Sequence, residues 1–302
     1  MELHFKSLPK LLDHFKDNAT CIAFLEQQRW GKNPICPHCG NKEVYRTNRG
    51  FKCKSCEKKF TVTVGTVFEN SKIKLNIWFA AIYLCTAHKK GISSLQLHRD
   101  LGVTQKTAWF MLPRIREMLR QKKSPLLQGT IQADETFVGG KNKNRHADKK
   151  VEESQGRSVK DKTPVFGLVN EGKVNTEVIP DTKATTLKPI IEAMVEKGAI
   201  VVTDEWNGYS GLGIDYNHQI IKHNEGKYKH NEFHTNSVEG FWSLLKRGIF
   251  GIYHYASPQH LNRYCDEFSY RYNTRKIDDS DRFMNSLTRT DGRLTYKQLT
   301  HK

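Results

Sequence analysis

The sequence predicts a mixed α/β protein in which a small cysteine-containing segment and a helical region precede a domain of strands and helices. Two observations lead to this prediction. The first is a pair of CxxC motifs before residue 60. The second is a change after residue 129 from helical periodicity to short runs rich in Val, Ile and Thr, which are typical of strands. An initial antiparallel hairpin followed by strands that alternate with helices favours a sheet of mixed direction.

The charge of the chain indicates the kind of partner. Its 302 residues suffice for two or three domains, and 49 Lys and Arg against 32 Asp and Glu give a net charge of +17. Such a surplus favours a polyanion, because cations that neutralise phosphates release counterions, although a merely soluble basic protein is the alternative. No apolar run approaches the roughly 18 residues that cross a bilayer, and no signal peptide opens the chain. We therefore expect a protein of the reducing cytosol without a membrane partner, whose seven cysteines are metal ligands or buried thiols.

The first 62 residues predict two short helices and a metal site. The helices lie around residues 9–15 and 18–30, and Asn18 or Thr20 is available as N-cap of the second. Two CxxC pairs follow, with 13 residues between the inner cysteines, and the strand-like runs between them can form a hairpin. A redox dithiol is the alternative, but two pairs in tandem favour one structural zinc ion. The expected zinc ligands are Cys36, Cys39, Cys53 and Cys56, with His38 as a weaker candidate.

The pattern of residues 63–125 predicts a helical region that resembles a helix-turn-helix. After a helix over residues 75–87, an apolar helix breaks at Gly102 and a second helix opens at Thr104, with Ala108 and Met111 facing inward. The start of the second helix offers polar side chains suited to base edges or phosphates, namely Thr104, Gln105, Lys106 and Thr107. An ordinary αα-hairpin remains the alternative.

The remaining elements follow in order from residue 129. We expect a strand over residues 129–140 with Asp134 near its end, then a hairpin over 164–180 and a helix over 184–198. A strand over 199–206 delivers Asp204, a further strand covers 218–223, and a last helix covers 257–275. The basic segment 141–162 contains almost nothing apolar, so it predicts a mobile loop that either closes over nucleic acid or is a solvated insertion.

Between those last two elements lies an amphipathic helix within residues 234–254. Its apolar side carries Val238, Phe241, Trp242, Leu245 and Ile249, and its polar side carries Asn236, Glu239, Ser243, Lys246 and Arg247. Glu239 and Lys246 are two turns apart and project at the same edge of the polar side. A carboxylate beside a cation indicates either a catalytic role for the two residues or an ion pair on the surface.

Three carboxylates stand on elements rigid enough to converge on hard cations: Asp134, Asp204 and Glu239. Two magnesium ions would need such oxygens, with positions left open for phosphate and water. Each residue also has a simpler explanation. Asp134 could cap a turn, Asp204 could be a surface residue, and Glu239 could belong to a capping box whose N-cap is Asn236.

Taken together, these motifs resemble those of a known family. The strand motifs ADET and TDEW, then 34 residues to Glu239 and seven more to Lys246, resemble the DDE transposases with a ribonuclease H-like core. The CxxC pairs, combined with DETFVGGK, VVTDEWNGY, HTNSVEGFWSLLKRGIFGIYH and YCDEFSYRYNTR, are similar to insertion-sequence transposases of the ISXO-like group, relatives of the eukaryotic Merlin elements. The resemblance runs from about residue 10 to 280.

The resemblance implies roles for individual residues. Asp134 and Asp204 would be the metal-binding catalytic aspartates, Glu239 the third acid, and Lys246 the contact to DNA phosphate, with Arg247 beside it. Members with Asn in the third position make Asn236 a second candidate, ranked after Glu239 because an amide brings no charge to a metal. His234 could touch substrate or only open the helix.

The implied activity is DNA transposition with two catalytic Mg²⁺ or Mn²⁺ ions. The partners would be the terminal inverted repeats and target DNA, bound by a homodimer or larger synaptic complex in a bacterial cytoplasm, at the nucleoid. The expected domains are 1–62, 63–125, a catalytic domain over 126–280 and a C-terminal tail over 281–302. The alternatives are a non-catalytic zinc-ribbon DNA-binding regulator and a ribonuclease H-like nuclease without strand transfer.

Overall fold

The chain divides into two units, and one of them is built from two stretches that are far apart in the sequence. In the computed structural model, unit 1 comprises Met1–Arg120 with Lys276–Lys302, and unit 2 comprises Gln121–Arg275. The structure describes residues 4–5, 7–121, 125–140, 146–152, 158–221 and 233–300. Residues 281–302, set apart above as a tail, thus group with the N-terminal residues. None of the helices in these described stretches has the length and apolar character needed to cross a membrane.

Unit 1 begins with two helices, α1 (Leu8–His14) and α2 (Asn18–Trp30), followed by a three-stranded sheet. Strands β1 (Val44–Thr47), β2 (Gly50–Cys53) and β3 (Lys59–Phe60) pair antiparallel, which confirms the predicted hairpin. The predicted N-caps of α2 are wrong. Asp17 caps the helix by accepting a 2.8 Å hydrogen bond from the amide of Thr20, whereas Asn18 accepts one from the amide of Leu75.

The core of unit 1 forms around α3 (Leu75–Ala87), which is buried on nearly all sides. Helices α4 (Ser94–Leu101), α5 (Gln105–Met118) and α9 (Asp279–Leu287) pack against it. Helix α10 (Tyr296–Thr300) contacts α5 through the rings of Tyr296 and Phe110. Helix α9 packs on α3 through Phe283, whose ring lies 5.8 Å from that of Phe79 and 6.2 Å from that of Phe15. The C-terminal residues therefore complete the apolar core of the N-terminal unit.

This packing predicts a large effect of Phe283→Ala. The ring is fully buried, so its removal leaves a cavity among aromatic neighbours and should destabilise unit 1 by about 3–5 kcal/mol. Thermal unfolding measured by circular dichroism checks the prediction. The control is Phe250→Ala, which removes a partly exposed ring and should cost far less. Equal unfolding temperatures for the two variants would contradict the packing.

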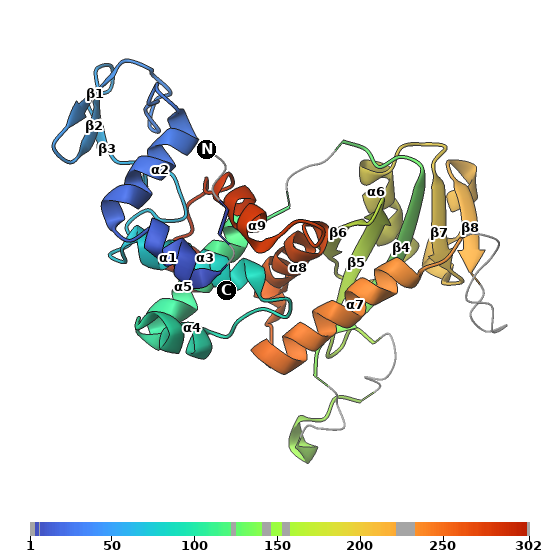
Figure 1. The fold of residues 1–302 in the computed structure, drawn as a ribbon. Coiled ribbons are helices and arrows are strands. Elements are labelled where there is room, and N and C mark those ends of the chain that lie inside the picture. The colour runs from blue at the N-terminus through green and yellow to red at the C-terminus, as the bar shows by residue number, and fades with distance from the viewer. Residues whose placement is uncertain are drawn as a thin grey trace. The chain divides into compact units, whose positions relative to one another are not determined.

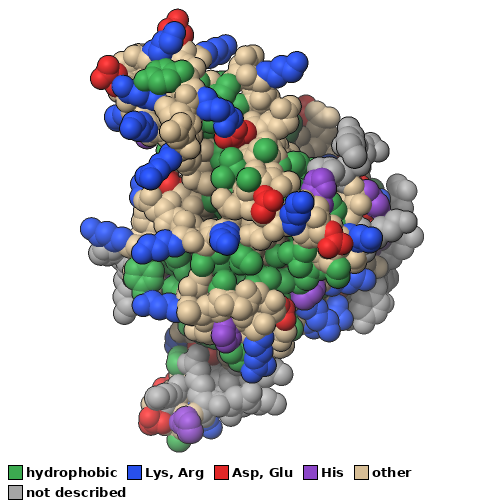
Figure 2. Space-filling model, turned by 60° about the vertical axis from the view of Figure 1, so that its left-hand side comes forward, with side chains coloured by type: hydrophobic (Ala, Val, Ile, Leu, Met, Phe, Trp, Pro, Cys, Tyr) green, Lys and Arg blue, Asp and Glu red, His purple; other side chains and the backbone are tan. Residues whose placement is uncertain are grey.

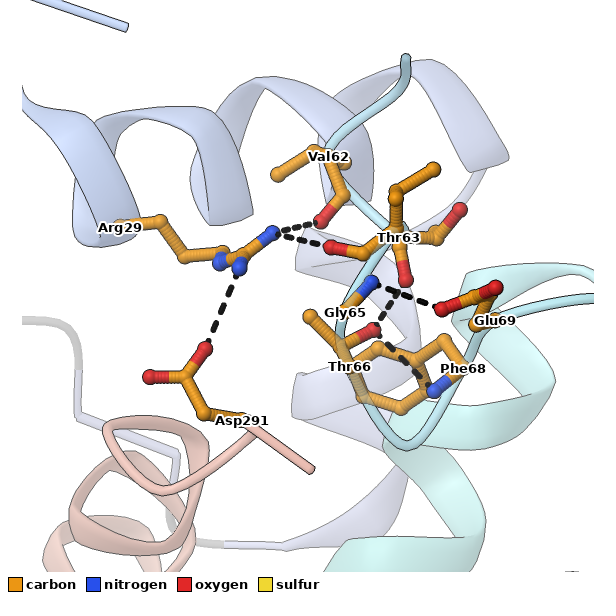
Figure 3. A network of polar contacts seen from close by, with 9 residues as sticks. Arg29, Val62, Thr63, Gly65, Thr66, Phe68, Glu69 and Asp291 are labelled. Carbon is orange, nitrogen blue, oxygen red and sulfur yellow. Dashed lines mark hydrogen bonds and ion pairs between the residues drawn. The ribbon is translucent and has the colours of Figure 1, made fainter. Parts of the chain in front are cut away.

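A polar network fixes the chain that leaves the three-stranded sheet (Figure 3). The guanidinium of Arg29 on α2 donates to the carbonyl oxygens of Val62 and Val64, and it forms a 3.1 Å ion pair with Asp291. The backbone amide of Val67 also donates to the carbonyl oxygen of Thr290. Three segments distant in sequence are thereby joined within unit 1.

Unit 2 contains a five-stranded mixed sheet of order β6-β5-β4-β7-β8. Its strands are β4 (Thr130–Val138), β5 (Thr163–Asn170), β6 (Lys173–Val178), β7 (Ile200–Asp204) and β8 (Asn217–Ile221). Strands β6, β5 and β4 pair antiparallel, and β4, β7 and β8 pair parallel. This confirms the predicted sheet of mixed direction and agrees with a ribonuclease H-like core.

Helices cover both faces of this sheet (Figure 1). Helix α6 (Ala184–Met194) packs on one face, and α7 (Asn236–Gly248) with α8 (Pro258–Asn273) packs on the other. Ile131 and Ala133 of β4 belong to the cluster with α6, so Gln132 and Asp134 point to the side of α7. Asp134 lies in the middle of β4 and not near its end as predicted, because pairing with β5 continues to Val138. The predicted loop 141–162 falls partly outside the described residues, which include a short turn at Ala147–Lys149.

Candidate active site and zinc site

Parallel pairing of β4 with β7 brings two of the three predicted carboxylates together. The last paired residues are Gln132 and Val202, and Asp134 and Asp204 each lie two residues further along. Since side chains alternate along a strand, both aspartates project on the same face of adjacent strands. Carboxylate oxygens of Asp134, Asp204 and the neighbouring Glu135 all lie within 4.8 Å of one another.

Glu135 is a member of this cluster that the sequence did not indicate. Neighbouring side chains in a strand point to opposite faces, so the strand pattern gave no sign that Glu135 would join Asp134. Strand β7 ends at Asp204. The side chains of Asp134 and Glu135, which leave β4 on opposite faces, can therefore both reach the carboxylate of Asp204 at this strand end. Glu135 is buried and accepts a 2.6 Å hydrogen bond from the hydroxyl of Tyr209.

The electrostatics of the cluster suit a divalent cation. Burial, reinforced by the charges of Glu135 and Asp204, raises the pKa of Asp134 to about 7, although a hydrogen bond from Trp242 opposes the rise. Crowded carboxylates of this kind repel one another until a positive charge is placed between them. Their hard oxygen donors fit Mg²⁺ or Mn²⁺, and Asp134 and Asp204 are the residues that would hold such ions.

The helix α7 begins differently from the prediction. Thr235, and not Asn236, is the N-cap residue, and its hydroxyl donates a 2.6 Å hydrogen bond to the carboxylate of Glu239. The capping box with Asn236 is therefore wrong. Asn236 and Glu239 are both exposed in the first turn of α7, and Glu239 is not among the three clustered carboxylates.

Gln132 of β4 holds this first turn. Its side-chain oxygen lies 3.2 Å from the amide of Ser237 and 3.3 Å from that of Val238, so it accepts from two amides at the helix start. Its amide nitrogen lies 3.3 Å from Nδ1 of His234. His234 thus contacts the strand at the entry to the helix. Sequence reasoning missed Gln132, because a polar residue in a strand carries no sign of its partner.

The remainder of α7 follows the predicted amphipathic pattern. All five residues of its apolar side are buried, namely Val238, Phe241, Trp242, Leu245 and Ile249. Lys246 is half-buried, and burial lowers the pKa of its ammonium group while the negative charge of Asp134 acts in the opposite direction. Lys246 therefore stands within electrostatic reach of the carboxylate cluster. Arg247 is exposed and donates to the carbonyl oxygen of Ser243.

The predicted zinc ligands also converge. The four sulfur atoms lie within 4.8 Å of one another, with Cys36 and Cys56 3.7 Å apart and Cys39 and Cys53 3.6 Å apart. Tetrahedral coordination with Zn–S bonds of about 2.3 Å places sulfurs about 3.8 Å apart, so the four thiols fit Zn²⁺. His38 is exposed and is not a member of this cluster.

Helices α4 and α5 form a pair joined by a short turn. Gly102 ends α4 with a left-handed backbone (φ +66°), and Thr104 caps α5 by accepting from the amide of Thr107. Ala108 and Met111 are buried, which confirms the expected inner face. Thr104, Gln105 and Lys106 are exposed, and Thr107 is partly buried.

Comparisons with known proteins agree with this architecture. The ISXO2-like transposase domain matches residues 126–273, and a transposase zinc-ribbon domain matches residues 16–59. A Halobacterium salinarum protein described as an uncharacterized protein in transposable element ISH50 is 29% identical over 262 residues, covering 82% of this chain and 88% of the relative. An uncharacterized transposase-like protein of Haemophilus influenzae is 30% identical over 106 residues, covering 35% of this chain and 85% of the relative.

A solved structure, a crystal structure of a pre-cleavage Mos1 transpososome, aligns over 96% of this chain and 98% of its own chain. Its TM-score of 0.26 and identity of 13% are too low to add to the assignment. The domain matches and the two relatives suffice without it. The chain belongs to the ISXO2-like transposase family and is a zinc-ribbon DDE transposase, an enzyme of the polynucleotidyl-transferase kind.

Proposed function

We propose that this transposase binds the ends of an insertion sequence, cuts DNA there and joins the cut ends to target DNA. The observation that carries the proposal is the convergence of Asp134 and Asp204 on adjacent parallel strands, with Lys246 in electrostatic reach. Two aspartates on adjacent strands and a cation on the helix that covers them supply what phosphoryl transfer needs, namely ligands for divalent ions and a positive charge for the phosphate.

In this mechanism Asp134 and Asp204 would hold two Mg²⁺ or Mn²⁺ ions. When bound, these ions supply activation of water or a 3′ hydroxyl and stabilisation of the leaving oxygen. Lys246 contacts a phosphate near the cut in this proposal, and the charge of Asp134 acts on its half-buried ammonium group. Arg247, one residue further and exposed, is placed to contact the DNA backbone.

In this proposal unit 1 binds the ends of the element. Seven Lys and Arg against two Glu lie between Cys36 and Phe60. Figure 2 shows Lys and Arg side chains gathered around the zinc ribbon at the top of the face that it draws. The exposed start of α5, with Thr104, Gln105 and Lys106, supplies polar groups for base edges or phosphates as in a helix-turn-helix. Since two ends must be joined, the working form is a dimer or a larger synaptic complex.

The third acid is best tested by comparing substitutions in one cleavage assay. Glu239, the proposed third acid, is exposed one turn before Trp242, whose indole contacts Asp134. Glu239→Gln should lower the Mg²⁺-dependent cleavage rate at least about a hundredfold, because the proposed site loses a charged ligand. Asn236→Ala should have a smaller effect. A wild-type rate for Glu239→Gln would contradict the ranking, and loss of cleavage in Glu135→Gln alone would assign the third position to the clustered Glu135.

The proposed function as a whole is tested with the purified protein, a labelled element end and Mg²⁺. Nicks at the end together with joined products are expected. Metal-dependent nicks without joined products would point to a nuclease. Binding with neither product would point to a non-catalytic regulator of the element.

A further inference from the structure

The side chain of Trp242 makes a direct contact with the carboxylate cluster. Its indole N–H donates a 2.9 Å hydrogen bond to Oδ2 of Asp134, across from helix α7 to strand β4. Trp242 belongs to the apolar side of the helix, and its ring is buried. The polar atom of that ring, Nε1, donates its hydrogen bond to a residue of the proposed metal site.

A glycine in the neighbouring strand makes room for this contact. Gly167 of β5 is paired directly with Asp134 in the antiparallel register. A methyl group on its Cα would lie 2.6 Å from both Cζ2 and Cη2 of the Trp242 ring, far inside van der Waals contact. The backbone of Gly167 does not have a positive φ, so its conformation is open to any residue. Space for the indole is therefore the physical reason for glycine at this position.

The helix that carries Trp242 is held in register with β4 at a second point. Gln132, two residues before Asp134 and on the same face of the strand, accepts from the amides of Ser237 and Val238 at the start of α7. The indole contact lies one turn further along the helix. The contacts of Gln132 and Asp134 with α7 lie at two points along both the strand and the helix. They leave the indole ring little freedom to move away from Asp134.

We propose that Trp242 is a positioning residue for Asp134, and that Gly167 is glycine so that the indole can reach the carboxylate. The indole N–H takes up one acceptor direction at Oδ2 and holds the carboxylate in a single orientation, leaving the other lone pairs for a divalent cation. The inference rests on the proposed function, since it makes Asp134 a metal ligand. Partners behind a metal ligand orient it in this way, and their loss typically costs about 10–100-fold in metal affinity or activity.

The test uses three variants of the full chain. Trp242→Phe keeps an aromatic ring but removes the donor and the second ring. Gly167→Ala keeps the indole but displaces it. The double variant combines the two, and because the phenyl ring lacks the part of the indole that meets the new methyl group, the second change should then add little. Mn²⁺ affinity of the zinc-loaded protein, measured by electron paramagnetic resonance of free Mn²⁺, and Mn²⁺-dependent cleavage are recorded for each.

Each single variant is expected to weaken Mn²⁺ binding about tenfold or more, and the double variant should be within about twofold of Trp242→Phe. Two controls separate this from loss of structure. Trp78→Phe removes another buried indole hydrogen bond of 2.9 Å, to Ser71 in unit 1, and Gly213→Ala adds a methyl group where nothing lies within 4 Å. Both should bind Mn²⁺ like the wild type, and Trp242→Phe should show a melting temperature similar to that of Trp78→Phe.

The outcomes distinguish the inference from the function on which it rests. Wild-type Mn²⁺ affinity in Trp242→Phe or Gly167→Ala, with cleavage intact, would overturn the role of Trp242 and leave the transposase mechanism standing. Additive effects of the two substitutions would overturn the role of Gly167. Absence of Mn²⁺ binding at Asp134 in the wild type would instead remove the proposed function itself.

Discussion

Asp134→Asn or Asp204→Asn is expected to lower Mg²⁺-dependent strand cleavage by about a thousandfold or more while leaving binding to the element ends unchanged. A bound metal ion contributes several kcal/mol of charge stabilisation in the transition state, and each 1.4 kcal/mol corresponds to about a tenfold change in rate. An amide has a similar shape but brings no charge to the ion. The measurement is single-turnover cleavage of a labelled element end, with binding followed by gel mobility shift.

Loss of folding is not expected to explain this result. Burial and neighbouring carboxylates already disfavour the charge of Asp134 in the metal-free protein, so a neutral amide there relieves repulsion. Asp215→Asn is the matched control. It removes a partly exposed carboxylate of unit 2 that pairs with Lys197, and surface pairs of this kind contribute little. Full cleavage by either site variant would refute the metal-binding assignment of that residue.

Removal of zinc should weaken binding to the element ends, with an effect nearly as large. The apolar core that holds the ribbon is small and includes two of the cysteines, Cys36 and Cys53, with Phe51 and Phe60. Folding of such a segment depends on the metal, whose binding supplies about 10–16 kcal/mol in zinc-finger peptides. Chelation, or Cys53→Ala, should therefore unfold residues 36–60 and weaken end binding at least about a hundredfold, because the basic side chains of the ribbon lose their arrangement.

Zinc content by atomic absorption and end binding by mobility shift check this expectation. Cys21→Ala is the control, since Cys21 is a buried thiol of α2 outside the four-cysteine cluster. It should keep one zinc ion per chain and bind like the wild type. End binding that survives complete zinc removal would show that the ribbon has no part in recognition.

Local patterns were sufficient for most elements of the fold. Period-two and helical patterns predicted the sheet of mixed direction, the buried side of α7 and the helix pair around Gly102, because those patterns arise from side chains of the element itself. The caps were harder to predict. Asp17 in place of Asn18, and Thr235 in place of Asn236, are one-residue differences that depend on backbone angles at the helix start.

The sequence by itself singled out the four cysteines and the two aspartates that come together in the structure, because residue type and spacing limit what such groups can do. Cys36, Cys39, Cys53 and Cys56 have the spacing of a closed zinc site, and Asp134 and Asp204 lie in strand patterns. Only the tertiary structure decided what surrounds them. The register of three strands and one helix brings Glu135 to Asp134 and Asp204, places Gly167 opposite Asp134 and aims the indole of Trp242 at its carboxylate. Such contacts join residues far apart in the chain, and no local periodicity encodes which atoms will meet across a sheet.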